Sequence, residues 1–333
     1  MKKGICVAGN MIVDILYQIS KWPKQGELVH VYDGVAKSTG GAVCNTIIDL
    51  ARLDPKMPLQ AMGRIGKDPE GELILKNMSA YPNIDTANLV SEGSSAFTLV
   101  LNDAQTNERT FFCSLGCNKK FVEEDIDWSK LDCDIFHIGY ILLLESLDQP
   151  DEEYGTKMAR LLHDVQAKGI KTSIDVVSES GDRFKTLVPP SMKYADYCII
   201  NELEASASTS IPLRDEKGGL ITENIEPCLR KMKEMGVKHW AVIHCPEGGY
   251  GLDENDKYVA LESLHLPKGY IKGSVGAGDA FCAGVLCGAE HGDSIEQAIT
   301  LGIATAAASL SEASATDGVL SAPEALELYK RLR

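Results

Sequence analysis

A glycine-rich turn that leads into an apolar helix is the clearest candidate for chemistry in this sequence. Gly276, Ala277 and Gly278 stand directly before Asp279, and the small apolar segment 280–289 follows. A turn of this kind leaves the first N–H groups of the helix unpaired, and with the helix dipole they suit a phosphate-like anion. A carboxylate beside such a site is useful if it accepts a proton from an attacking hydroxyl. A first-turn Asp is also an ordinary helix start, so both interpretations stay open.

Two other phosphate-binding patterns fail on spacing. The P-loop pattern needs Ser or Thr after its Lys, but Gly66-Lys67 is followed by Asp68. A dinucleotide fingerprint that began at Gly276 would need glycine where the chain has Phe281. The missing fingerprint disfavours a nicotinamide-dependent dehydrogenase.

A second group of polar residues, near the start of the chain, suits the recognition of hydroxyl groups. Asp14 interrupts an apolar segment, and Gly40-Gly41 opens a segment of helical spacing that contains Asn45 one turn later. A carboxylate can accept two hydrogen bonds from a diol, and an amide can both donate and accept. Asp14 could equally be a strand-end residue that faces water, and a glycine pair before a helix is a weak signal by itself.

The elements that must position these residues alternate between strands and helices. Short apolar runs typical of buried parallel strands occur at 4–9, 135–138, 171–177, 197–200 and 239–244. Ligands of such sheets bind at the carboxyl ends of the strands, where several of the polar candidates fall. We predict one α/β domain over 1–333, a doubly wound, mostly parallel sheet with helices on both faces. A small inserted sheet is predicted from strands at 12–18, 27–35, 96–102 and 109–114.

The composition excludes some functions. The 333 residues carry a net charge of −15, which argues against nucleic acid or an anionic membrane as partner. None of the ten cysteines forms C-x-x-C, and most stand among apolar residues, as core cysteines do in a reducing compartment. The sequence has no run of 18 apolar residues for a membrane span. We therefore expect a cytoplasmic protein.

The turn before the apolar helix resembles the second signature of the ribokinase-like (PfkB) carbohydrate kinases, roughly D-[ST]-x-G-A-G-D-x-F. The matching positions are Ser274, Gly276, Ala277, Gly278, Asp279 and Phe281. Gly273 stands where the family usually has Asp. That Asp helps to bind a monovalent cation in potassium-activated relatives, so K⁺ activation of this protein is in doubt.

Further motifs follow the order of the same family. Gly40, Gly41 and Asn45 resemble its first signature, G-G-x-x-x-N, and Asn201 with Glu204 resembles its N-x-x-E motif. The resemblance implies ATP-dependent phosphorylation of a hydroxymethyl group on a sugar or sugar-like alcohol. Asp279 would be the base and the amides of Gly276, Ala277 and Gly278 the anion hole; the substrate contacts would be Asp14, Gly40, Gly41 and Asn45.

The resemblance also implies a lid and a nucleotide site. The small sheet would cover the sugar and clasp a second copy in a homodimer, with Arg109 facing the substrate; a solvated Arg109 beside Glu108 is the alternative. Asn201 and Glu204 would organise Mg²⁺ through water, or simply cap a helix. The remaining nucleotide contacts would be His244, which replaces the Thr of a T-x-G motif, with Gly248, Ser274, Gly276 and Gly278.

Some alternatives stay open within this resemblance. The family's D-x-N-x-R motif is absent because Asp175 is followed by Val-Val-Ser-Glu, so an acidic keto-sugar loses support as substrate. An adenosine-type nucleoside kinase has the same fold. A non-catalytic protein that binds sugar or nucleotide is disfavoured by the intact Asp279 and its glycines.

Overall fold

A nine-stranded sheet forms the centre of the molecule in the computed structural model, which describes residues 3–32, 34–106, 108–178 and 181–333. The strand order is β15-β14-β13-β12-β11-β8-β1-β4-β5, and only the pairings of β14 and β15 are antiparallel. The strands are β1 Ile5–Gly9, β4 Leu59–Ile65, β5 Ile84–Ser91, β8 Ile135–Ile141, β11 Lys171–Val176, β12 Tyr197–Asn201, β13 Trp240–Cys245, β14 Gly248–Leu252 and β15 Tyr258–Glu262. The predicted mostly parallel α/β sheet is confirmed.

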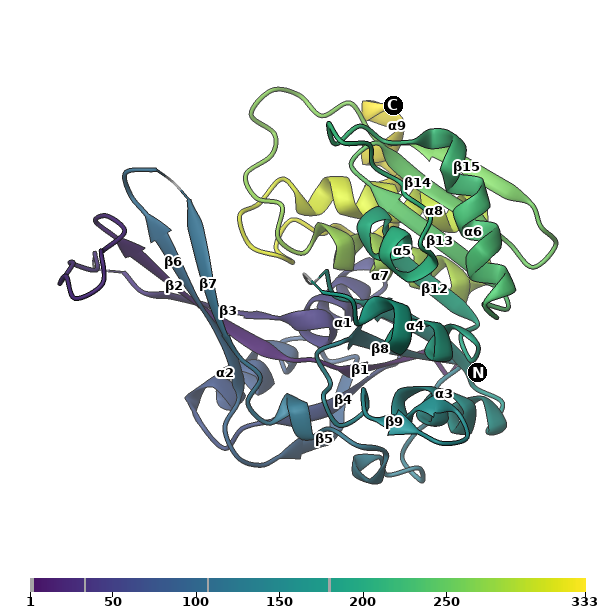
Figure 1. Cartoon of the computed structure of the whole chain (residues 1–333), viewed down its shortest axis with the longest axis horizontal. Helices are drawn as coiled ribbons and strands as arrows, with labels where there is room; N and C mark the ends of the chain where they lie inside the picture. The colour runs from purple at the N-terminus through teal and green to yellow at the C-terminus, as the bar shows by residue number, and fades with distance from the viewer. Residues whose placement is uncertain (1–2, 33, 107, 179–180) are drawn as a thin grey trace.

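Helices cover both faces of this sheet (Figure 1). They are α1 Gly41–Leu53, α2 Pro69–Met78, α3 Lys157–Ala167, α4 Phe184–Met192, α5 Glu202–Thr209, α6 Ile225–Glu234, α7 Ala277–His291, α8 Ile295–Ser309 and α9 Ala322–Leu332. Alternate side chains of β1 enter two separate cores. Ile5 and Val7 pack on the face covered by α1, α7 and α8. Cys6 packs on the opposite face, which α3 to α6 cover. Because both faces are covered, the strands read as continuous apolar runs.

A four-stranded sheet, the lid, projects from one side of the main body (Figure 1). Its order is β3-β2-β6-β7, and its strands are β2 Ile12–Ile19, β3 Ala36–Gly40, β6 Ala96–Asp103 and β7 Arg109–Ser114. Shorter elements are β9 Pro150–Asp151, β10 Gly155–Thr156 and 3-10 turns at Asn118–Lys120, Glu123–Asp125 and Thr222–Asn224. The predicted four-stranded lid is therefore confirmed as an element.

One predicted lid strand is wrong. Residues 27–35 form no strand in their described part and make a single bridge, between Val31 and Ile19; Asp33 lies outside the described residues. Residues 36–40 take that place beside β2. The apolar side chains of 27–35 have no core to face, since Leu28 is 92% exposed and Val31 47% exposed. Without a buried face, alternation alone does not hold a strand.

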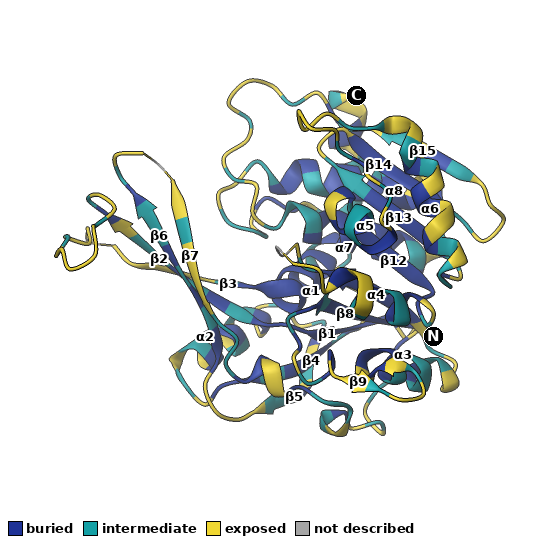
Figure 2. Ribbon diagram, in the orientation of Figure 1, coloured by how far each residue is buried: buried dark blue, intermediate teal, exposed yellow. Residues whose placement is uncertain are grey.

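Burial separates the main body from the lid. Figure 2 shows the strands of the main sheet and α7 mostly buried, whereas β7 and the loops of the lid carry exposed residues. Most cysteines are buried and all ten are free; Cys113 is exposed. Among the described residues, no helix combines the length and the apolar character needed to cross a bilayer.

Candidate active site

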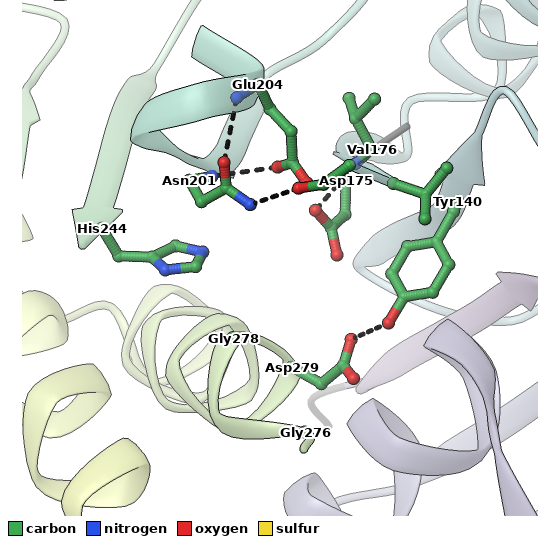
Figure 3. A pocket seen from close by; sticks show the side chains of 11 residues that line it. Tyr140, Asp175, Val176, Asn201, Glu204, His244, Gly276, Gly278 and Asp279 are labelled. Carbon is green, nitrogen blue, oxygen red and sulfur yellow. Dashed lines mark hydrogen bonds between the residues drawn. The ribbon is translucent and has the colours of Figure 1, made fainter. Parts of the chain in front are cut away.

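The turn before α7 brings Asp279 to the carboxyl edge of the main sheet. Gly276 has φ +80°, and a Cβ there would lie 2.6 Å from the Cβ of Ala315, so only glycine fits. The amide of Ala277 reaches the carbonyl of Ser274 at 3.4 Å. The helix start faces a cavity that Gly276, Gly278 and Asp279 line (Figure 3). A helix end and a carboxylate therefore line the same cavity, an arrangement that suits an anion beside a base.

Asp279 is held by hydrogen bonds from two distant elements. Asn45 Nδ2 on α1 donates to Oδ2 at 2.8 Å, and the Tyr140 hydroxyl on β8 donates to Oδ1 at 2.7 Å. Burial raises the pKa of Asp279, and these two hydrogen bonds partly oppose the rise. A carboxylate with a raised pKa accepts protons more readily, which suits a general base. Sequence reasoning missed Tyr140, which stands in an apolar strand with no motif around it.

The residues predicted to bind substrate come together where β1, β2 and α1 meet. Gly41 has φ +85°, and a Cβ there would lie 2.5 Å from Asn10 Oδ1; a Cβ on Gly40 would lie 2.7 Å from Asp14 Oδ2. Asn10 is 1% exposed, and neither of its amide atoms has a partner among the described residues. The same holds for Asn45 Oδ1. Such buried groups suit the hydroxyls of a bound polar molecule.

Arg109 lies apart from this group. In the lid, Asp14 pairs with Thr98, whereas Arg109 pairs with Asn102 near the tip of the β6–β7 hairpin. Asn102 lies four residues beyond Thr98 on β6, which corresponds to about 13 Å along the strand. Arg109 is exposed, so the register supports the solvated alternative and contradicts its expected place over the substrate.

Asn201 and Glu204 do cap a helix, and they also face the cavity. Asn201 Oδ1 accepts from the amides of Leu203 and Glu204, while Glu204 Oε2 accepts from the amide of Asn201. The Ser178 hydroxyl donates to Glu204 Oε1 at 2.8 Å. Burial raises the pKa of Glu204 to about 7, although the hydrogen bonds from Asn201 and Ser178 oppose this rise. The two interpretations of the N-x-x-E motif are therefore compatible.

The cavity in front of Asp279 measures about 270 Å³ and is acidic. Asp175, Glu204 and Asp279 line it, and no Lys or Arg is among its described lining residues (Figure 3). Burial, with the charges of Glu204 and Asp279, raises the pKa of Asp175. Oxygen ligands without a cationic partner suit a hard divalent cation. Asp175 and Glu204 are the side chains placed to hold one.

A second cluster with metal-binding side chains lies beneath the cavity. One ligand atom each from His137, Asp175 and Cys282 fall within 4.8 Å of one another. A tetrahedral zinc ion would hold such atoms roughly 3.3–3.7 Å apart. His137 Nε2 and Cys282 Sγ are 4.0 Å apart, and His137 Nδ1 contacts Ser173 Oγ at 3.0 Å. The separation of the His137 and Cys282 atoms exceeds that of zinc ligands, so we interpret the cluster as a hydrogen-bonded group of the core.

A larger apolar cavity of about 570 Å³ adjoins the acidic one. Asn201, His244 and Gly278 line both cavities. Gly248 and Ser274 line the second, and its apolar wall includes Phe281, Leu264, Ile303, Ala306, Ala307 and Leu310. Burial lowers the pKa of His244 to about 4, so its imidazole is neutral. Five of the seven residues predicted to bind nucleotide thus line a pocket whose apolar wall suits a base, whereas Glu204 and Gly276 line the acidic cavity.

Comparison with known proteins gives one consistent result. A family model described as pfkB family carbohydrate kinase matches residues 2–322. A ribokinase of Arabidopsis thaliana is 24% identical over 310 residues, which cover 92% of this chain and 75% of that protein. The structure of Arabidopsis thaliana ribokinase with ribose and ATP superposes with TM-score 0.80 at 20% identity, covering 99% of both chains. A nucleoside kinase of Methanocaldococcus jannaschii gives TM-score 0.74 at 16% identity, with 98% of both chains covered.

Proposed function

The chain belongs to the pfkB family of carbohydrate kinases, and we propose that it transfers the γ-phosphoryl group of ATP to a hydroxymethyl group of an uncharged sugar or sugar-like alcohol. One observation carries the proposal: the Asp279 carboxylate lies at the start of α7, where the acidic cavity meets the residues of β1, β2 and α1. A base, an anion-binding helix end and a group of hydroxyl-binding side chains therefore converge.

The reaction follows from these positions. The acceptor hydroxyl loses its proton to Asp279 as its oxygen attacks the γ-phosphorus, and the bond from that phosphorus to the ADP oxygen breaks. The amides of Gly276, Ala277 and Gly278 stabilise charge on the transferring group. The lid excludes water, which would otherwise compete as acceptor.

The acidic cavity fits a magnesium ion. Asp175 and Glu204 would hold it directly or through water, as few protein ligands are typical for Mg²⁺ in kinases. When bound, the ion neutralises charge on the nucleotide phosphates. No monovalent cation is expected, because Gly273 offers no carboxylate next to the carbonyls of Glu312 and Ala313.

An uncharged acceptor suits the substrate side. Asp14 is a carboxylate whose pKa burial raises, and Asn10 and Asn45 are amides, so these groups favour hydroxyls over an anionic substituent. The position of the family's motif Arg holds Glu179, which lies outside the described residues. Nucleosides also carry a hydroxymethyl group and belong among the acceptors tested.

A homodimer through the lid is part of the proposal. Of the eleven large apolar side chains that are exposed among the described residues, seven belong to the lid and its loops: Trp22, Leu28, Val31, Tyr32, Val35, Phe111 and Phe112. Such a concentration marks an interaction surface. A second copy of this chain is its occupant, since paired lids would cover both patches at once.

The test is ADP release from MgATP with a panel of ketoses, pentoses, inositols, sugar acids and nucleosides, in potassium and in sodium buffer. We expect turnover with an uncharged acceptor, at similar rates in both buffers. Asp279→Asn should lose at least about 10³-fold in kcat and keep its ATP affinity, because the amide cannot take the proton. Turnover retained in that variant, or a sugar acid as the best acceptor, would overturn the corresponding part of the proposal.

A further inference from the structure

Tyr140 stands between the two halves of the site. It lies near the carboxyl end of β8, which pairs with β1 on the substrate side and with β11, the strand of Asp175, on the other. Its ring lines the acidic cavity and its hydroxyl points at Asp279 (Figure 3). No motif in the sequence assigns it a role.

The phenol is the donor in its contact with Asp279. Burial raises the pKa of Tyr140, and the charges of Asp279 and Asp175 raise it further, so the hydroxyl keeps its proton. The contact is therefore O–H to carboxylate at 2.7 Å, a charge-assisted hydrogen bond. Asn45 donates to the other oxygen, so any rotation of the carboxylate breaks two bonds.

We propose that Tyr140 is a positioning residue for the base: its hydroxyl fixes Asp279 Oδ1, so that a free lone pair of that oxygen faces the cavity where acceptor and phosphoryl group meet. This role rests on the proposed phosphoryl transfer. The same hydrogen bond favours the ionised form of the base at a site where no Lys or Arg is among the described residues that line the cavity.

The surroundings of Asp279 make the two donors necessary. Its titratable neighbours are Cys44 and Asp49 on α1, Asp175 on β11, Glu204 on α5, His244 on β13 and Cys282 on α7. His137 on β8 lies behind Cys282, with its Nε2 4.0 Å from Cys282 Sγ. The carboxylates oppose a further negative charge, and burial keeps His137 and His244 neutral. Hydrogen bonds from Asn45 and Tyr140 are what lower the pKa of Asp279. Loss of one therefore raises that pKa.

Tyr140→Phe removes the hydroxyl and keeps the ring. We expect kcat to fall about ten-fold at pH 7, the KM values for acceptor and ATP to stay within about three-fold, and the acidic limb of the pH profile of kcat to move to higher pH. The matched control is Tyr197→Phe on β12, which is separated from β8 by β11. This variant loses a hydroxyl that accepts a hydrogen bond from Lys171 Nζ at 3.2 Å and that does not line the acidic cavity. Its profile should equal that of the wild type.

The outcomes separate the two proposals. An unchanged pH profile and kcat in Tyr140→Phe, with an active wild type, would overturn the positioning role and leave the kinase function intact. A wild type without acceptor-dependent turnover would count against the proposed function. In that case the positioning role is tested by ¹³C NMR titration of the aspartate carboxyl groups. The resonance of Asp279 is the one that disappears in Asp279→Asn. A carboxyl that titrates at the same pH in wild type and Tyr140→Phe would refute it.

Discussion

Glu204 both caps a helix and faces the acidic cavity. It completes the capping box of α5 and lines the acidic cavity beside Asp175. Buried carboxylates without a cationic partner prefer the neutral form, so the site is best prepared for a cation and unfavourable without it. In the absence of magnesium, ionisation of Glu204 should therefore lower the free energy of unfolding as the pH rises.

Glu204→Gln tests that cost. The pKa of Glu204 is raised from 4.5 to about 7. Burial of this carboxyl therefore costs no folding free energy below pH 4.5, where it is protonated in both states, and the wild type loses stability as the pH rises through 7. Relative to the wild type, the variant should gain up to roughly 3 kcal/mol of unfolding free energy between pH 5 and pH 8, measured by urea unfolding in EDTA. Its turnover should need at least about ten-fold more Mg²⁺.

The matched control is Glu324→Gln in the capping box of α9, where the carboxylate is exposed. Its hydrogen bonds with Ser321 lower its pKa, so this variant should show no gain at high pH. Equal pH dependence in Glu204→Gln and wild type would contradict the burial argument.

Helix α1 connects Asn10 and the lid to Asp279, the proposed base. Its first residue, Gly41, touches Asn10, and one turn later Asn45 donates to Asp279. The 18 residues of β3 and α1, 36–53, thus carry the chain from the lid to the main body. The backbone at Gly41 therefore determines how α1 packs against Asn10 and where Asn45 points.

Gly41→Ala should disturb this junction. Its positive φ costs about 1 kcal/mol for alanine, and the new Cβ would also push against Asn10 Oδ1 at 2.5 Å. Gly169→Ala is the control, because Gly169 has φ +79° and nothing within 4 Å. We expect Gly41→Ala to lose more stability than the control in thermal unfolding and to raise the acceptor KM about ten-fold. Indistinguishable variants would remove the argument for a tight junction.

At the scale of the whole molecule, most exposed large apolar side chains among the described residues gather on the lid and its loops, while Leu203 and Ile271 line the larger cavity. The lid consists of β2, β3, β6 and β7, and it projects from the main body with exposed residues on β7 and its loops (Figure 2). Trp22 and Phe112 stack with ring centroids 6.4 Å apart. A lid that pairs with a second copy would be held in place over the acceptor, so assembly and turnover should be linked.

Phe111→Asp and Phe112→Asp test this link. Each puts a charge into the apolar surface of the lid, so we expect a shift from dimer to monomer in sedimentation velocity and a higher acceptor KM at low protein concentration. Leu320→Asp, on an exposed apolar residue before α9, is the control and should stay dimeric. A wild type that sediments as a monomer across micromolar concentrations would reject the dimer.

Local patterns were enough to predict the sheet, the Gly276–Asp279 turn and the Gly40-Gly41 junction. Apolar runs indicate strands buried on both faces, and glycines such as Gly41 and Gly276 indicate turns with positive φ, so neither signal depends on distant partners. The lid strand was misplaced because alternation in 27–35 says nothing about whether a core faces it.

The contacts that make the site required the tertiary structure. Asn45 and Asp279 are 234 residues apart, and Tyr140 and Asp279 are 139 apart, so no local pattern relates them. Asp175 joins the cavity because β11 lies beside β8, and Arg109 leaves it because hairpin register moves it to the tip. The sequence alone determined which residue types could do the chemistry; the packing of strands and helices decided which of them meet.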